Sequence, residues 1–286
     1  MISWLTSSFF WSKWTILITG FSLIDIERDR KPILWRHFLP LGLLMFWIVF
    51  TMYQKRAYPW YHLTRLYFPN EYLRYQWANV FRHIPFNNGW PFRIFHTPFL
   101  DFYFRFVYRA AFFLNLWVCV FRGFFARDSR KMFHYMIGAF IIQMVIIMPF
   151  YYFVNLNEVW YTLGDPDHLQ RHLHGIALFR TIGDCFPSMH TSCAVGVLLL
   201  ALREKSPVFR WTMVTYCASV VYATLYLEVH WLLDVVAGIA LAYVAVKVSD
   251  VIVHGLWDVW PERIVALGQK LFVHSVSSPT SNIKKS

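Results

Sequence analysis

Long hydrophobic runs alternate with short polar or charged segments along this chain of 286 residues. A helix that crosses a lipid bilayer needs ~20 mostly apolar residues, with a working range of about 17–25. Six runs meet that requirement, at residues 38–54, 102–121, 132–154, 185–202, 211–227 and 231–248. The pattern therefore predicts an all-α integral membrane protein built as a bundle of six transmembrane helices.

The first 31 residues carry a shorter apolar run, from residue 14 to residue 24, between Lys13 and Asp25. This run is too short to span a bilayer. Tryptophan and phenylalanine side chains in and before it favour a helix that lies at the level of the lipid headgroups. No small-residue cleavage site follows the run, which argues against a secretory signal peptide. We expect residues 1–31 to contain an N-terminal interfacial helix.

Composition and charge point to the same class of protein. Hydrophobic residues make up 57% of the chain and charged residues 15%, whereas soluble domains contain about 25% charged residues. A soluble protein of this size is therefore excluded. The net charge of +11 comes from basic clusters between the apolar runs, which indicates topology signals and contacts with anionic lipid headgroups. Nucleic acid, a partner of many basic soluble domains, is not expected.

The basic clusters also predict the orientation of the chain. Lys and Arg are frequent in the links at residues 122–131 and 203–210, whereas the link at 158–184 is rich in acids. The positive-inside rule then places both termini in the cytoplasm and the acidic link on the exoplasmic (periplasmic or lumenal) side.

Four units are expected along the chain. They are an N-terminal interfacial segment, two spans joined by an aromatic and basic exoplasmic cap, a four-span core, and a flexible cytoplasmic tail, at residues 1–31, 32–131 (cap 53–100), 132–260 and 261–286. The basic residues of the cap run against the positive-inside rule. We therefore interpret the cap as a layer over the headgroups.

One candidate chemical site lies where the fourth run begins, in the segment from Gly183 to Thr191. Pro187 favours the start of a helix, which places Ser188 and free backbone N–H groups at a helix N-terminus. Such a terminus binds phosphate through its oriented N–H donors and the helix dipole. His190, beside it, exchanges a proton near neutral pH.

A second candidate site lies where the sixth run begins, at His230 and Asp234. Residues four apart share one helix face. The carboxylate therefore accepts a hydrogen bond from one ring nitrogen and leaves the other free as a nucleophile or base, as in a catalytic triad. Either histidine alone would ordinarily be an interface residue. The conjunction of both on one predicted side favours a catalytic site.

These residues resemble a known family. The segment Phe186-Pro187-Ser188-Met189-His190 is similar to the Pro-Ser-x-His motif of the type 2 phosphatidic acid phosphatase superfamily, and the segment from Ala223 to His230, followed by Asp234, is similar to its last motif. The resemblance covers roughly residues 135–248 and implies the six-helix bundle of that superfamily. It implies that His230 is a nucleophile that becomes a phosphohistidine, that Asp234 orients it, and that His190 protonates the leaving alcohol. Ser188 would hold phosphoryl oxygens, with no metal and no cofactor.

The sequence departs from the superfamily in its basic residues. It lacks the usual Lys-x6-Arg-Pro motif, and Ala223-Thr224 replace the usual Ser-Arg. The Ala-Thr-x-Tyr-Leu form resembles inositol phosphorylceramide synthases, and Gly183-Asp184 resembles sphingomyelin synthases.

Other residues are therefore candidates for binding substrate. Arg180 and Arg171, in the acidic link, are candidate phosphate ligands, although Arg180 is equally well explained as a topology charge. Arg105 and Arg109 either face the cavity or pair with Asp101 and snorkel. Asp184 either orients a histidine or a hydroxyl, or forms a turn.

The expected function is that of a lipid phosphotransferase that moves a phosphate-bearing headgroup between lipids on the exoplasmic face. The alternative is a phosphatase of the same superfamily that acts on a lipid phosphate or pyrophosphate, with water as the acceptor. A non-catalytic lipid-binding protein is disfavoured, because it would have no need to retain His190, His230 and Asp234. The four cysteines show no CxxC spacing that would indicate zinc or a redox pair.

Overall fold

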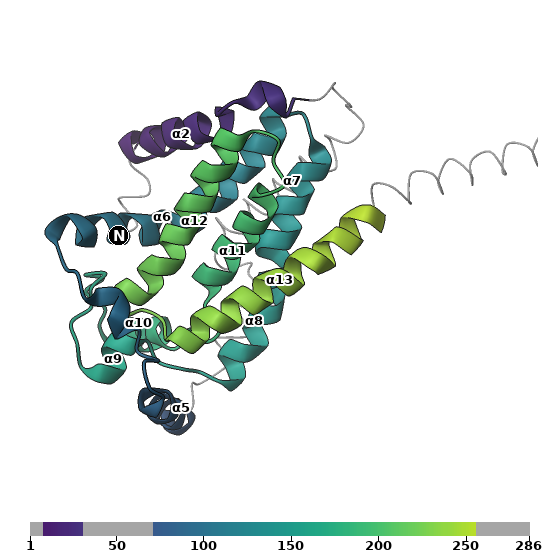
Figure 1. Cartoon of the computed structure of the whole chain (residues 1–286). Coiled ribbons are helices and arrows are strands. Elements are labelled where there is room, and N and C mark those ends of the chain that lie inside the picture. Colours follow the sequence, from purple (N-terminus) through teal and green to yellow (C-terminus); the bar gives the residue numbers. More distant parts are fainter. Residues whose placement is uncertain (1–7, 31–70, 256–286) are drawn as a thin grey trace, which may run out of the picture.

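The computed structural model describes residues 8–30 and 71–255, and these residues form helices joined by turns (Figure 1). The expected span at 38–54, the whole of the expected tail at 261–286 and the first part of the cap lie outside the described residues. The described elements are α2 (Ser8–Leu23), η1 (Ile26–Arg28), α5 (Glu71–His83), η2 (Trp90–Arg93), α6 (Pro98–Phe125), α7 (Ser129–Met136), the π-helical η3 (Ile137–Ile141), α8 (Ile142–Phe153), α9 (Val159–Leu163), α10 (Gly175–Ile182), α11 (Met189–Ala201), α12 (Pro207–Tyr226) and α13 (Leu232–His254).

The long helices begin at residues suited to cap them. Thr97 accepts a hydrogen bond from the amide of Leu100 at the start of α6, and Ser206 accepts one from Phe209 at the start of α12. Each of these caps is followed by a proline, whose missing N–H costs nothing in the first turn of a helix. The sequence therefore fixes these helix starts locally.

Two described helices are long and apolar enough to cross a membrane: Arg130–Tyr151, which runs through α7, η3 and α8, and Leu232–His254. A third is added if α6, bent by 57° between Pro98–Ala111 and Leu114–Phe125, counts as one span. α11 has only 13 residues, and α12 is less apolar than α13. These helices support a membrane protein, while the count of six spans stays a prediction.

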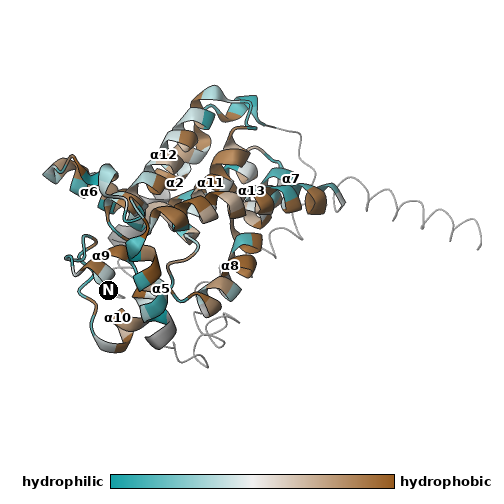
Figure 2. Cartoon of the chain, turned by 60° about the horizontal axis from the view of Figure 1, so that its bottom comes forward, coloured by the Kyte–Doolittle hydropathy of each residue, from teal (hydrophilic) through white to brown (hydrophobic). Residues whose placement is uncertain are grey.

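α11 is the central helix of the bundle, between α12 and α13 (Figure 1). Its side chains Cys193, Ala194 and Val197 are fully buried. At Gly196 an added Cβ would meet the Gln143 side chain and the Ala139 backbone, so α8 and η3 approach α11 closely. Figure 2 shows apolar residues dominating α8, α11 and α13, whereas α5 carries a hydrophilic face.

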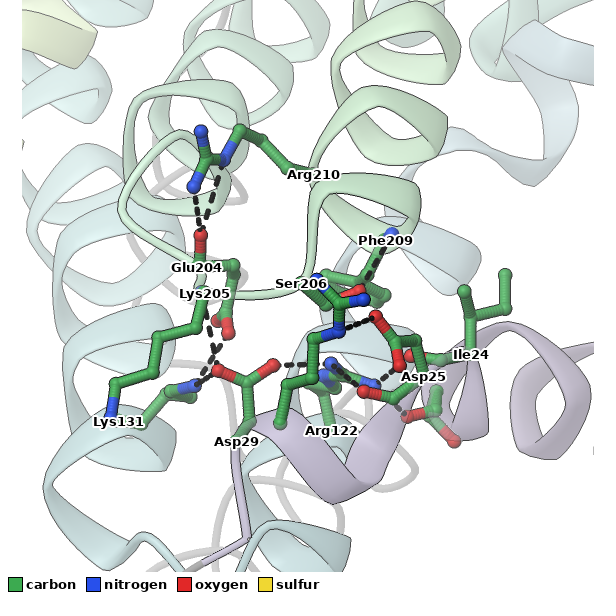
Figure 3. A network of polar contacts seen from close by, with 12 residues as sticks. Ile24, Asp25, Asp29, Arg122, Lys131, Glu204, Lys205, Ser206, Phe209 and Arg210 are labelled. Atoms are coloured by element: carbon green, nitrogen blue, oxygen red, sulfur yellow. Dashed lines mark hydrogen bonds and ion pairs between the residues drawn. The ribbon is translucent and has the colours of Figure 1, made fainter.

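A buried network of ionic contacts joins several segments at one end of the bundle (Figure 3). Arg122 of α6 pairs with Asp29, which follows η1, and both side chains are almost fully buried. Lys131 of α7 lies 3.3 Å from the Asp29 carboxylate and 2.5 Å from that of Glu204, in the link between α11 and α12. The network thus brings together the two basic links that the sequence places on one side, and it anchors the segment after α2 to them.

The opposite end of the bundle contains α5, α9 and α10, together with the starts of α11 and α13 (Figures 1 and 2). Phe81 of α5 packs edge-on against Trp231, with ring centroids 6.0 Å apart. Asn87 accepts hydrogen bonds from the amides of Leu232 at 2.7 Å and Leu233 at 3.0 Å. The described part of the cap therefore covers the first turn of α13.

Candidate active site

The first motif forms the turn that starts α11. The Ser188 hydroxyl accepts a hydrogen bond from the amide of Thr191 at 3.2 Å and so caps the helix. The amide of Ser188 donates to the backbone carbonyl of Asp234 at 3.1 Å. This bond ties the start of α11 to the first turn of α13, so the two sequence motifs form one structural unit.

His230 lies just before α13 and is almost fully buried. Its Nδ1 atom is 3.0 Å from the carbonyl oxygen of Cys185 and 3.5 Å from Oδ2 of Asp234. Because a carbonyl oxygen only accepts, Nδ1 must carry the ring proton. The other nitrogen, Nε2, then keeps its lone pair, as a nucleophile requires.

Asp234 orients several groups in addition to His230. Its Oδ2 atom accepts hydrogen bonds from the amide of Trp231 at 2.9 Å and from the thiol of Cys185 at 2.9 Å. Its Oδ1 atom is buried and has no hydrogen-bond partner among the described residues. The sequence predicts the pairing of this carboxylate with His230. It gives no sign that the carbonyl and thiol of Cys185 share the work of orienting the ring.

The structure brings the two predicted histidines together. The rings of His190 and His230 have centroids 6.1 Å apart and planes inclined by 55°. The ring of Tyr108, in α6, stacks on the ring of His190, with centroids 4.0 Å apart. Sequence reasoning missed Tyr108, because an aromatic side chain in an apolar run signals only burial.

The predicted phosphate ligands have different surroundings. Arg171 pairs with Glu158 and also lies 3.0 Å from Asp167. Burial alone would lower the pKa of Arg171, but the hydrogen bonds that its guanidinium donates to these carboxylates raise the pKa above its usual value, so the guanidinium stays charged. Its charge acts electrostatically on the ring of His190. Arg171 is therefore a cation of the acidic link that two carboxylates hold in place and whose charge reaches His190.

Asp184 is exposed at the turn before Cys185. Arg180 belongs to α10, but its side chain lies outside the described part of the structure. Arg105 donates to the carbonyl of Asp101 one turn earlier at 3.0 Å, and Arg109 donates to the carbonyl of Leu169. Both of these arginines therefore bind backbone oxygens.

Cys185, His230 and Asp234 form a group whose potential metal ligands lie within 4.8 Å of one another. These atoms already bind each other, since the thiol donates to the carboxylate at 2.9 Å and lies 3.5 Å from His230 Nδ1. Hydrogen bonding accounts for the cluster without a metal ion.

Comparison with protein families decides the superfamily of the core. Residues 133–257 match the family model described as the PAP2 superfamily. The chain carries a PAP2 superfamily domain. The matched range contains both histidine motifs, which makes the chain an enzyme of phosphatase or phosphotransferase type, as the sequence predicts. The finer resemblance, to inositol phosphorylceramide and sphingomyelin synthases, stays a prediction.

The chain was also compared with curated proteins and with solved structures. No curated protein matches the chain. The structure is similar to the crystal structure of LpxE from Aquifex aeolicus, with a TM-score of 0.43 and 18% sequence identity, over 55% of this chain and 89% of that one.

Proposed function

We propose that this PAP2-domain protein is a lipid phosphotransferase that moves a phosphate-bearing headgroup from a phospholipid to an alcohol acceptor through a phosphohistidine on His230. One observation carries the proposal: His230 presents Nε2 with a free lone pair while His190 lies 6.1 Å away, ring to ring. Two imidazoles so placed contact the same phosphoryl group from two sides. The reaction takes place on the exoplasmic face, given the charge distribution of the links.

The reaction begins with attack on phosphorus. Nε2 of His230 forms the P–N bond while the ester P–O bond breaks, and protonated His190 gives its proton to the departing oxygen of diacylglycerol. In the second half, neutral His190 takes the proton of the acceptor hydroxyl as that oxygen attacks phosphorus. The P–N bond then breaks, and His230 returns to its starting form.

Charge on the phosphoryl oxygens is balanced by preorganised donors. The first turn of α11, capped by Ser188, presents backbone N–H groups and the positive end of its dipole. Arg171, fixed by Glu158 and Asp167, supplies a nearby positive charge. Because the sequence lacks the usual basic motifs of the superfamily, Arg180 and Asp184 remain candidate ligands for the headgroup.

Hydrolysis is the second candidate, favoured by the phosphatase superfamily that the domain matches. Water would replace the acceptor alcohol in the second half, and every catalytic residue would keep its role. Headgroup transfer is preferred because of the similarity of the motif from Ala223 to His230 to synthases that transfer headgroups.

The decisive experiment incubates the purified full-length protein with a phospholipid labelled in its headgroup, with and without ceramide as acceptor. Acceptor-dependent diacylglycerol and a new labelled lipid are expected. Release of a soluble labelled phosphate irrespective of ceramide would overturn transfer in favour of hydrolysis. His230→Ala and His190→Ala should each abolish turnover, whereas His254→Ala, at the other end of α13, should not. Full turnover by either active-site variant would refute the mechanism.

The covalent intermediate has its own assay. With a nitrophenyl phosphate ester, whose leaving group needs no proton, His190→Ala should accumulate an acid-labile, alkali-stable phosphate on His230, detected by mass spectrometry. Absence of that adduct together with rapid release of nitrophenol would contradict a phosphohistidine.

A further inference from the structure

A cavity of about 420 Å³ is lined by residues of α5, α9 and α10, and neither histidine of the active site lines it. These three helices lie together at one end of the bundle (Figures 1 and 2). Its polar lining consists of two arginines (Arg74 and Arg82), two asparagines (Asn79 and Asn157), two tyrosines (Tyr75 and Tyr161) and Thr162, and no acidic side chain lines it among the described residues. Its volume falls within the range of roughly 300–1,000 Å³ that is typical of small-molecule sites.

Arg74 is held rigidly in the wall of this cavity. Its side chain is 4% exposed, its Nε donates to Oδ1 of Asn155 at 2.6 Å, and its Nη1 donates to the carbonyl of Phe179 at 2.6 Å. The guanidinium also lies 3.9 Å from the centroid of the Phe179 ring. A cation fixed in this way loses little entropy when it binds a ligand.

Arg82 supplies a second positive charge, which is exposed, whereas Arg74 is buried. It is exposed in the last turn of α5, and it has no ion-pair partner in the part of the chain that the structure describes. The hydroxyl of Tyr161 and the amides of Asn79 and Asn157 add neutral donors and acceptors around the same space. The Thr162 hydroxyl donates to the backbone carbonyl of Glu158 at 3.1 Å and keeps its oxygen as an acceptor for a ligand hydroxyl. This combination suits an anion that also carries hydroxyl groups.

The cavity shares walls with the catalytic turn. A Cβ atom added at Gly183 would overlap the guanidinium of Arg74, so the chain passes directly over that arginine just before Cys185. On the neighbouring side, the carbonyl of Asn157 accepts a hydrogen bond from the indole of Trp231, the residue after His230, at 2.8 Å. A ligand in the cavity therefore lies one layer of residues from both histidine motifs.

We propose that this cavity is an anion-binding subsite for a hydroxyl-bearing phosphate group, with Arg74 and Arg82 as its charged ligands. A lipid headgroup and a soluble phosphate monoester share this chemistry. The assignment of the subsite to the headgroup of a substrate rests on the function proposed above, whereas binding of the anion does not.

The test measures binding to the full-length protein in dodecyl maltoside, in a His230→Ala background that prevents turnover. Glycerol 3-phosphate is the soluble probe, and phosphatidic acid in the micelles is the lipid probe. Glycerol and dioleoylglycerol serve as uncharged controls. We expect at least one phosphorylated probe to bind and Arg82→Gln to weaken it about tenfold, as loss of a charge-assisted hydrogen bond predicts. Arg127→Gln, the same change on an exposed arginine beyond the far end of α6, should leave the affinity unchanged.

Each outcome decides the proposal. Binding of phosphatidic acid without glycerol 3-phosphate would identify a lipid headgroup as the source, and the converse would identify a soluble ester. Failure of both probes to bind, or equal weakening by Arg82→Gln and Arg127→Gln, would overturn the subsite. Because Arg82 is exposed, its variant folds, and Thr162→Val provides an independent uncharged change that should also weaken binding.

The failure of the subsite and the failure of the proposed function are distinguishable. Arg82-dependent binding by a protein that makes no lipid product would leave the subsite intact and refute the function. Turnover by a protein whose binding does not depend on Arg82 would refute the subsite and leave the proposed function intact.

Discussion

The phenol ring of Tyr108 stacks on the imidazole of His190, with centroids 4.0 Å apart and planes inclined by 24°. Tyr108 is buried in α6, so its position is set by that helix. The stack restricts the orientation of the imidazole, and a misplacement of ~1 Å at a catalytic group costs about 100-fold in rate.

We predict that Tyr108→Ala lowers kcat by about 10- to 100-fold, whereas Tyr108→Phe, which keeps the ring, retains most of the turnover. Steady-state assays in mixed micelles would measure both variants. Equal losses in the two would show that the hydroxyl, and not the stack, carries the effect.

Cys185 is predicted to position the His230–Asp234 pair. Its thiol donates to Oδ2 of Asp234 at 2.9 Å. Cys185→Ser keeps a donor and should retain most of the activity, while Cys185→Ala leaves the carboxylate without that donor and should lower kcat more than KM. Cys193→Ala, an equally buried cysteine in α11, is the matched control. A loss as large in Cys193→Ala would show that packing alone is responsible.

At Gly238, α13 approaches the start of α11 closely. A Cβ atom there would lie 2.8 Å from the carbonyl oxygen of Ser188 and 3.1 Å from Cβ of Thr191. Gly238→Ala should therefore separate the two histidine motifs, with a destabilisation of about 1–3 kcal/mol and a larger fall in turnover than in thermal stability. Gly20→Ala in α2, where nothing lies within 4 Å of the added atom, should preserve both properties. The same assays and thermal unfolding in detergent compare the two variants.

The buried pair of Arg122 and Asp29 predicts a strong effect of single substitutions. Removal of one member of a buried ion pair costs about 3–5 kcal/mol, because the remaining charge is uncompensated. Arg122→Met should therefore lower the midpoint of thermal unfolding sharply, and the double variant with Asp29→Asn should recover part of the loss. Arg30→Gln, in an exposed pair with Glu27, should have little effect. A double variant no more stable than Arg122→Met would contradict the pairing.

The contact between His168 and Glu228 predicts a dependence of stability on pH. His168 Nε2 lies 3.3 Å from Oε2 of Glu228, and this close carboxylate raises the pKa of His168 above its ordinary value. Burial alone would raise the pKa of Glu228, but the bond from His168 and the charge of Arg93 hold it below its ordinary value.

The two shifts define a pH window. The stabilisation by His168 is complete below its unfolded pKa of about 6.5 and is lost as pH rises through the higher folded value. The stabilisation by Glu228 is lost as pH falls through its lowered folded pKa, below the unfolded value of about 4.3. The unfolding midpoint should therefore decline as pH rises above the unfolded pKa of His168, about 6.5, and His168→Gln should flatten that decline. An unchanged slope in the variant would exclude this pair as the cause.

The helices and the two motifs were predictable because their signals are local. Apolar run length predicts the helices that cover most of residues 132–154 and 231–248, and a helix start at Ser188 follows from the proline before it. Five expected spans coincide with described helices, with α6 longer than expected and α11 shorter.

The remaining features depend on partners far along the chain. Hydrophobicity indicates that a side chain leaves water and says nothing about which surface it meets. The stack of Tyr108 on His190 and the placement of Arg74 beneath Gly183 are therefore invisible in the sequence. The role of Cys185 is invisible for the same reason, because its thiol bonds the carboxylate of Asp234, 49 residues later in the chain.

The buried carboxylate of Asp29 has a consequence for biosynthesis. It bonds Arg122, which is 93 residues later in the chain, and the amide of Lys205, which is 176 residues later. A ribosome therefore releases Asp29 long before the groups that neutralise it, and the carboxylate must remain hydrated in the meantime. The segment that follows the amino-terminal helix therefore completes its polar contacts only after Lys205 has been translated.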